Sequence, residues 1–320
     1  MMKKTISQCM IVKNEEKNIR RALSWGKDIM YEQIVVDTGS SDRTVEIARE
    51  MGAKIFFFPW INDFAAAKNF AIDQAKGDWI AFLDADESFT PEDTKKIPEI
   101  LEYVGDDVDG LLTGIVDLDE NNHITSGGTM IRFFVNRPDL RYVGKIHEHL
   151  VRKGRSGLHL TDATKQLAFL HTGYQEQEKR DKSKFERNLN IILEILKQEP
   201  ENCDYLGYLG DTYSSDGKNE EARDAYKKAV AAMPEKLEVY DQRSSYTYTN
   251  LLRVSQCLKA PEAEVEAIYK EAVEKLPKEP DFDCVMGDWY WRKGQYEKAV
   301  QMYELAIAKL ETYGTVNRGI

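Results

Sequence analysis

The chain has 320 residues, of which 42% are hydrophobic and 31% charged, and its formal net charge is −11 at pH 7. This length suggests about two domains, and the apolar fraction is sufficient to build folded cores. A strongly acidic chain is a poor general nucleic-acid binder, because such a binder needs a basic surface to displace counterions. We therefore expect no nucleic acid among its partners.

Cysteine spacing and hydropathy indicate the cell compartment. The four cysteines are far apart in the chain: Cys9, Cys203, Cys257 and Cys284. This spacing predicts neither a zinc finger nor a disulfide framework, and it favours a reducing environment. No apolar run approaches the ~18 residues of a membrane-spanning helix, and no signal peptide is evident. We expect a cytoplasmic protein with no membrane span.

Short apolar runs and helical patterns alternate at the start of the chain. The expected strands are residues 5–12, 33–36, 54–58 and 79–83, and the helices between them include 44–51 and 62–76. Alternation of this kind predicts a mainly parallel sheet covered by helices on both faces.

Polar residues follow three of these strands. Asn14 and Glu15 come after the first, Asp37 after the second, and Asp84 and Asp86 after the fourth. Such residues gather at one edge of the sheet, where open α/β sheets bind ligands. If the backbone stayed extended after the fourth strand, Asp84 and Asp86 would face the same side, and one Mg²⁺ or Mn²⁺ could meet both carboxylates. The alternative is that these acids only cap the following helix.

Two common nucleotide-binding motifs are absent. No GxGxxG follows the first strand, and no GxxxxGK[ST] occurs anywhere in the chain. Their absence disfavours a dinucleotide-dependent dehydrogenase and a P-loop NTPase.

Four segments stand in the order seen in family 2 glycosyltransferases: Ile11–Glu15, Val36–Thr44, Asp63–Asn69 and Phe82–Glu87, the last with a D-x-D pair. On these motifs, residues 5–175 resemble that family. The resemblance implies a GT-A fold, a Rossmann-like α/β domain with a mixed sheet. It also implies inverting transfer of a sugar, of the hexosyl type, from a nucleotide diphosphate sugar. A UDP-sugar is favoured as donor, and Mn²⁺ or Mg²⁺ as the divalent cation.

The resemblance also implies a set of donor-binding residues: Ile11, Val12, Asn14, Glu15, Asp37, Gly39, Lys68, Asp84, Ala85 and Asp86. Asp37 would contact the base or ribose, Asp84 the ribose or metal, and Asp86 the metal itself. Many relatives carry arginine at the position of Lys68, and lysine keeps the charge but loses the bidentate fork. The alternatives are that Asp37 is a turn residue and Lys68 a solvated helix lysine.

Residues 91–175 are expected to form the acceptor side of the site. A helix over 91–103 precedes a hairpin of strands 110–118 and 129–136, packed beside the central sheet. The run His147-Glu148-His149 follows, and it lacks the HExxH spacing of a zinc protease. A base must take a proton from the acceptor, and we assign Glu148 first and His147 second. The alternative is that His147 and Glu148 form a structural pair. By the resemblance, His171 would be the third metal ligand, with Asp84 and Asp86.

The second half of the chain has only helical patterns. Pro200 and Pro234 are 34 residues apart, the period of tetratricopeptide repeats, and a second match begins near Met286. Pro277 marks a degenerate repeat, with an insertion expected near 238–246. We therefore expect an α/β GT-A domain over residues 1–175 and an all-α, tetratricopeptide-like domain over residues 176–320.

Repeat arrays present surfaces that bind peptides or proteins. We expect the array to bind a peptide or protein acceptor or to form a homodimer, with support of the catalytic domain as the alternative. Its aromatic residues are expected mainly in the core: Tyr246, Tyr248, Trp289, Tyr290 and Trp291.

The sequence thus predicts an inverting, metal-dependent glycosyltransferase acting on a peptide, a protein or a precursor of a cell-surface glycan. A first rival is an interaction scaffold that binds a nucleotide sugar without transferring it. A second rival is a nucleotidyltransferase, but the glycine-rich basic loop of such enzymes is absent.

Overall fold

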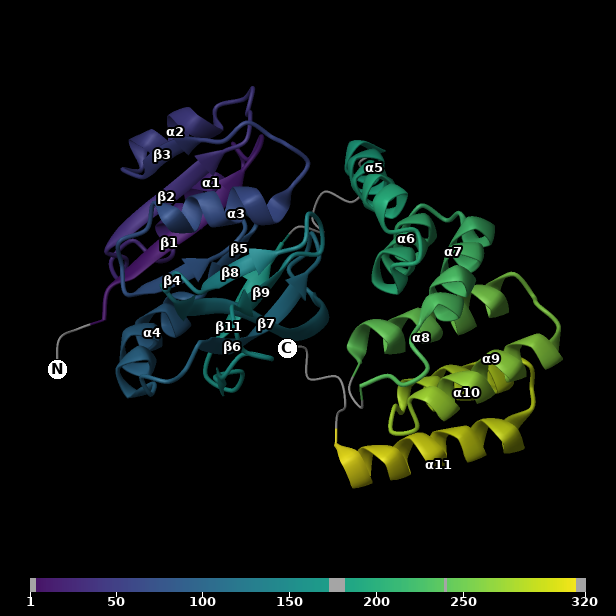
Figure 1. The fold of residues 1–320 in the computed structure, drawn as a ribbon. Helices are drawn as coiled ribbons and strands as arrows, with labels where there is room; N and C mark the ends of the chain where they lie inside the picture. The colour runs from purple at the N-terminus through teal and green to yellow at the C-terminus, as the bar shows by residue number, and fades with distance from the viewer. Residues whose placement is uncertain (1–3, 173–181, 239–240, 315–320) are drawn as a thin grey trace. The chain divides into compact units, whose positions relative to one another are not determined.

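The computed structural model describes residues 4–172, 182–238 and 241–314 (Figure 1). The chain divides into two compact units, whose described parts are residues 4–172 and residues 182–314 without 239–240. The domain boundary expected between residues 175 and 176 lies outside the described residues.

Four parallel strands form the first part of the large sheet in the amino-terminal unit. They are β1 (Ile6–Val12), β2 (Glu32–Asp37), β3 (Lys54–Phe57) and β4 (Trp79–Phe82). Their spatial order is β3-β2-β1-β4, and Val12 lies beside Asp37 in the register of β1 and β2. The strands expected from the sequence are confirmed to within one residue at each end. The carboxyl ends of β1, β2 and β4 therefore share one edge of the sheet.

Three helices cover the two faces of these strands: α1 (Ile19–Ser24), α2 (Thr44–Glu50) and α3 (Phe64–Asp73). Residues of α3 pack with Ile34, Val36 and Phe82, whereas α1 and α2 pack with the alternate residues Met10 and Val35. Successive side chains of a strand point to opposite faces, so the strands are buried on both sides. This explains why β4 is an uninterrupted apolar run.

The sheet continues with strands of mixed direction. They are β5 (Glu87–Phe89), β6 (Gly110–Leu118), β7 (Ile124–Val135), β10 (Leu160–Asp162) and β11 (Ala168–His171). The order runs β4-β7-β6-β11-β5, with β10 beside β6. The expected hairpin is present, but it extends the sheet instead of packing beside it, because β7 pairs antiparallel with β4. The result is the mixed sheet expected of the fold class.

Three elements complete the amino-terminal unit: α4 (Pro91–Tyr103) and the separate two-stranded sheet of β8 (Leu140–Val143) and β9 (His149–Arg152). Thr90 caps α4, because its side chain accepts a hydrogen bond from the backbone N–H of Asp93. The alternative that Asp84 and Asp86 serve only to cap this helix is therefore wrong.

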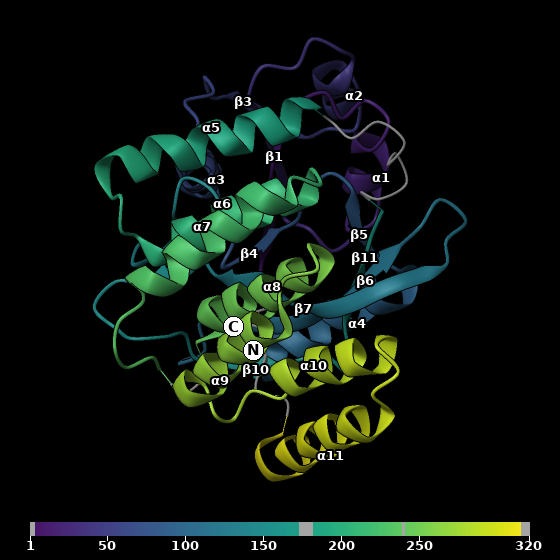
Figure 2. The same ribbon diagram turned by 90° about the vertical axis from the view of Figure 1, so that its right-hand side faces the viewer.

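The described part of the second unit consists of helices: α5 (Lys182–Gln198), α6 (Cys203–Ser215), α7 (Asn219–Ala232), α8 (Gln242–Cys257), α9 (Glu262–Lys275), α10 (Asp281–Arg292) and α11 (Tyr296–Tyr313). Helices α6 and α7 lie side by side, as do α10 and α11 (Figure 2). Part of the insertion expected near 238–246 lies outside the described residues, and α8, with 16 residues, is longer than α6 with 13.

Glycine and tyrosine residues set the spacing of the repeat helices. A Cβ at Gly210 would lie 2.4 Å from the Tyr226 ring, and one at Gly287 would lie 2.6 Å from the Tyr303 ring. Each tyrosine hydroxyl also donates to the aspartate after the glycine, Asp211 or Asp288, at 2.7 Å. The small residue thus lets the paired helices approach closely.

Of the five aromatic residues expected mainly in the repeat core, Tyr248, Trp289 and Tyr290 are buried, whereas Tyr246 and Trp291 are exposed. The four cysteines are free thiols. Among the described residues, no helix has the length and apolar character needed to cross a membrane.

Candidate active site

The loops after β1 and β2 are bonded to each other. Asn14 adopts a left-handed backbone, with φ of 59°, and its side chain accepts a hydrogen bond from the backbone N–H of Ser41 at 2.8 Å. In return, Ser40 Oγ accepts from the Asn14 N–H, and Thr44 Oγ1 accepts from the Glu15 N–H at 2.7 Å. Two segments of the predicted donor site therefore form one hydrogen-bonded wall at the sheet edge.

Asp37 is buried at the end of β2 and organises the turn that follows. Its carboxylate accepts hydrogen bonds from the backbone N–H groups of Gly39 and Ser40 at 3.1 Å. Gly39 has φ of 112°, a conformation that residues with a Cβ rarely adopt. The described contacts of Asp37 are those of a turn residue, and its contact with a nucleotide stays a prediction.

The backbone turns directly after β4, at the D-x-D pair. The N–H of Glu87 donates to the carbonyl of Asp84 at 3.1 Å, which closes a turn over residues 84–87. The backbone is therefore not extended here, and a shared cation at Asp84 and Asp86 stays a prediction. Asp84 Oδ2 lies 3.4 Å from Arg132 Nη2, whereas Asp86 Oδ2 lies 3.4 Å from His171 Nε2.

His171 is held between two carboxylates at the end of β11. Its Nδ1 lies 2.8 Å from Asp117 Oδ1 on β6, and its Nε2 faces Asp86. The bond to Asp86 raises the pKa of His171 to about 9; burial opposes this shift, and Asp117 adds to it. Asp117 also accepts a hydrogen bond from the Ser126 hydroxyl. Asp117 is not among the site residues expected from the sequence, although an acid within an apolar strand was a possible signal.

Lys68 is buried in α3, with only 5% of its surface exposed. Its Nζ lies 2.6 Å from Glu148 Oε1 and about 5 Å from the ring centres of Phe82 and Tyr142. Burial lowers the pKa of Lys68. The nearby Asp84, Tyr142 and Glu148 raise the pKa by more than burial lowers it, so the net shift is upward. The alternative of a solvated helix lysine is wrong. Glu148, the first candidate for the base, is thus fixed by a buried cation.

Three positively charged groups act on Asp84. Burial raises the pKa of its carboxyl group, but the charges of Lys68, Arg132 and His171 outweigh burial and leave the pKa lowered. Asp84 therefore remains ionised at neutral pH.

His147, the second candidate for the base, is exposed and has a left-handed backbone, with φ of 53°, next to Glu148.

Comparison with known proteins decides the family. Residues 7–152 match the model described as glycosyl transferase family 2, and residues 205–235 and 285–314 match tetratricopeptide repeat models. Over residues 7–152 the amino-terminal domain is therefore similar to glycosyl transferase family 2. This confirms the family, the GT-A fold class and the repeats expected from the sequence.

Curated proteins include relatives that are one-third identical to this chain. The SPbeta prophage-derived glycosyltransferase SunS of Bacillus subtilis (strain 168) is 33% identical over 231 residues, which cover 71% of this chain and 53% of SunS. A TPR repeat-containing protein of Synechococcus elongatus is 33% identical over 218 residues, covering 66% of this chain and 53% of that protein. The chain spans about half the length of these curated relatives.

Solved structures similar to this chain include S. aureus TarS 1–349 in complex with UDP-GlcNAc. That structure is 16% identical, the match covers 81% of this chain and 93% of TarS 1–349, and the TM-score is 0.46. A likeness of this strength supports no inference about the donor or the acceptor.

The predicted metal ligands of the glycosyltransferase domain come together only in part. Asp86 and His171 are neighbours, whereas Asp84 is directed toward Arg132. Within the described ranges, no group of three His, Cys, Asp or Glu residues is already arranged around a potential ion position. The oxygen and imidazole donors that do meet are of the types that suit Mn²⁺.

The charges around the turn over residues 84–87 are unbalanced. Three groups of ion pairs lie there: Lys68 with Glu148, Arg132 with Asp84 and Glu87, and His171 with Asp86 and Asp117. Five carboxylates are thus paired with three basic side chains. This excess of negative charge is an environment that fits a divalent cation.

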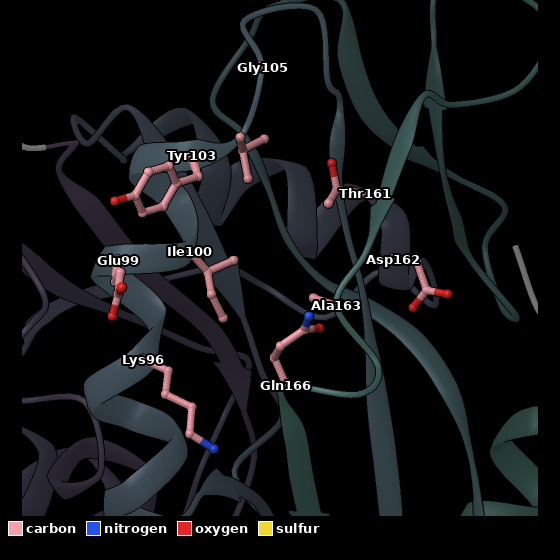
Figure 3. A pocket seen from close by; sticks show the side chains of 10 residues that line it. Lys96, Glu99, Ile100, Tyr103, Gly105, Thr161, Asp162, Ala163 and Gln166 are labelled. Atoms are coloured by element: carbon pink, nitrogen blue, oxygen red, sulfur yellow. The ribbon is translucent and has the colours of Figure 1, made fainter.

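A separate hollow lies beside α4 and the end of β10. It has a volume of about 430 Å³ and is lined by Ile100, Tyr103, Thr161 and Gln166 among others (Figure 3). None of the predicted donor, metal or base residues lines it. The hollow is therefore distinct from the acid-lined edge of the sheet.

Proposed function

We propose that the chain is an inverting glycosyltransferase that moves a sugar from a UDP-sugar to an acceptor with the help of a divalent cation. The observation that carries this proposal is the meeting of Asp86 and His171 at the strand edge of a family 2 domain. In open α/β sheets, ligands bind at that edge.

The donor would bind against the wall formed by the loops after β1 and β2. Hydrogen bonds between Asn14, Ser40 and Ser41 pre-organise that wall, which lowers the entropy cost of binding a nucleoside. Asp37, through the turn that it holds, would position Gly39 close to the base or ribose. The positive charge of Lys68 would lie near the diphosphate, and the same charge favours the ionised form of Asp84.

Asp86 and His171 would hold the cation, and Asp84 would join them after a change of side-chain rotamer. When bound, the cation would offset the charge that develops on the departing diphosphate. Asp117 fixes the Nδ1 side of the His171 ring, which leaves Nε2 directed at Asp86. The protein thereby holds both donor atoms on the same side of the site.

Glu148 is the proposed base for the acceptor, and His147 is the second candidate. The bond from Lys68 fixes the position of the Glu148 carboxylate, and a fixed base is one requirement of proton abstraction. The acceptor would attack the anomeric carbon from the face opposite the diphosphate.

The repeat domain supports a peptide or protein as the proposed acceptor, because stacked repeats present extended binding surfaces. A precursor of a cell-surface glycan is the alternative acceptor. The competing function is a scaffold that binds nucleotide sugars without turnover. The cytoplasmic location stays a prediction.

The test is release of UDP from a panel of UDP-sugars with Mn²⁺, Mg²⁺ or EDTA, using the purified full chain. We expect slow donor hydrolysis with a metal and none with EDTA. Asp86→Ala should reduce turnover by at least about 100-fold and leave thermal unfolding unchanged, because Asp86 is a partly exposed turn residue. Asp107→Ala, in an exposed loop, is the control. Tight donor binding without turnover under every metal and acceptor would instead favour the scaffold.

A further inference from the structure

Arg132 is a buried cation to which the proposed chemistry gives no role. It lies on β7, the strand that pairs with β4, and only 6% of its surface is exposed. Its guanidinium group is 5.3 Å from the centre of the Phe169 ring. The Arg132 side chain is therefore held against a residue of a neighbouring part of the same sheet.

Glu87 connects Arg132 to the turn that carries the D-x-D acids. One carboxylate oxygen of Glu87 accepts a hydrogen bond from Arg132 Nη2, and the other accepts from the backbone N–H of Asp84 at 3.0 Å. The N–H of Glu87 donates in turn to the carbonyl of Asp84. The two ends of the turn are thus tied together through one buried side chain.

Arg132 also contacts the first acid of the pair directly. The nitrogen that binds Glu87 lies 3.4 Å from Asp84 Oδ2, so Nη2 serves both carboxylates. The buried Nε of Arg132 has no hydrogen-bond partner among the described residues. A buried donor without a partner has an energetic cost, so this geometry is not the one that would best stabilise the fold.

We propose that Arg132 is a positioning residue that, through Glu87, fixes the turn over residues 84–87 and so sets where Asp84 and Asp86 point. The inference rests on the proposed function, because it matters only if these acids hold a cation and a donor. A buried ion pair can often be replaced by apolar residues without loss of stability. Such a replacement therefore tests whether Arg132 and Glu87 affect metal binding apart from their effect on stability.

The experiment compares Arg132→Met, Glu87→Met and the double variant. Each single variant leaves a buried charge without its partner, so we expect a lower melting temperature. The double variant removes both charges, and we expect it to recover most of that loss. Mn²⁺ affinity should be lower than that of the unmodified chain in all three variants, by roughly 10-fold to 100-fold, as for other residues that orient metal ligands. Unlike the melting temperature, it should not recover in the double variant.

Mn²⁺ binding is measured by the loss of the free-ion electron paramagnetic resonance signal, with and without UDP. Arg152→Met is the matched control, because Arg152 pairs with the buried Asp109 at 2.9 Å and also with Asp139, neither of which is an acid of the turn. It should lower the melting temperature and leave Mn²⁺ affinity unchanged. Arg132→Lys keeps the charge but loses the planar fork, so it should fold well and bind Mn²⁺ with intermediate affinity.

The two proposals fail in different ways. If the unmodified chain bound neither Mn²⁺ nor UDP with Mn²⁺, the proposed function would be wrong, and this inference with it. If the unmodified chain bound both and the double variant bound them equally tightly, Arg132 would be a structural residue only. Should the double variant not fold, Arg132→Lys with unchanged Mn²⁺ affinity would overturn the proposal in the same way.

Discussion

At the scale of single residues, two basic side chains of the candidate site are held by acids from distant parts of the chain. Lys68 on α3 pairs with Glu148 before β9, and His171 on β11 is fixed by Asp117 on β6. These partners decide which atom faces the site. In His171 the Nδ1 side is occupied by Asp117, so Nε2, which faces Asp86, is the nitrogen that would bind a cation once its proton is released.

The contact between Asp117 and His171 predicts the effect of Asp117→Asn on metal binding. Because an amide holds the imidazole ring less strongly than a carboxylate does, Mn²⁺ affinity should fall by about 10-fold. Isothermal titration with Mn²⁺ in the presence of UDP measures this change. Ser126→Ala, which removes another partner of Asp117, should have a smaller effect. Equal affinity in Asp117→Asn and the unmodified chain would contradict the role of Asp117.

At the scale of elements, the repeat helices pair through a recurring contact between glycine and tyrosine. Gly210 on α6 faces Tyr226 on α7, and Gly287 on α10 faces Tyr303 on α11. Glycine lowers helix stability by about 1 kcal/mol relative to alanine, so local propensity favours replacing it. Packing opposes that replacement, because the ring already occupies the space that a methyl group would need.

The repeat contact predicts that Gly210→Ala destabilises the helical domain. The Cβ would lie 2.4 Å from the Tyr226 ring, and we expect a loss of about 1–3 kcal/mol in spite of the better helix propensity of alanine. Urea unfolding of the full chain, followed by circular dichroism, measures the loss. Ser214→Ala, at an exposed position of the same helix, should be neutral or slightly stabilising. A gain in stability for Gly210→Ala would contradict this prediction, because it would show that α6 and α7 can move apart with little loss of packing energy.

At the scale of the whole molecule, the last described helix keeps an apolar stripe in solvent. Tyr296, Val300, Ile307 and Leu310 recur at helical spacing on α11 and are exposed, with 49% exposure for Val300 and 54% for Ile307. Terminal repeats usually present a polar outer face. The homodimer expected from the sequence stays a prediction, and this stripe is the surface to test, since a twofold axis lets one surface bind its own copy.

The α11 stripe predicts that the double variant Val300→Glu/Ile307→Glu is monomeric. Four like charges would face one another across the pair, so the dimer should dissociate, as measured by light scattering after size-exclusion chromatography. Leu305→Glu is the control, because the helical period places Leu305 on another side of α11, where it is 45% exposed. If the unmodified chain were monomeric at all concentrations, the homodimer prediction would be wrong.

Much of the fold follows from local patterns in the sequence. Apolar runs bounded by turns located β1 to β4, and the proline period located the tetratricopeptide repeats. These patterns are readable because strand and helix periodicity depend on neighbouring residues. The same reasoning placed Asp37, Asp84 and Asp86 after their strands, at one edge of the sheet.

Tertiary structure alone decided how the site is assembled. The sequence could not show that the chain turns at Asp84, that Lys68 is buried against Glu148, or that Arg132 supports the turn through Glu87. These contacts join residues 80 and 45 positions apart, and no periodicity of the chain encodes such a pairing. The residues of the site were therefore set by sequence, whereas their orientation depends on which distant side chain each of them meets when the sheet forms.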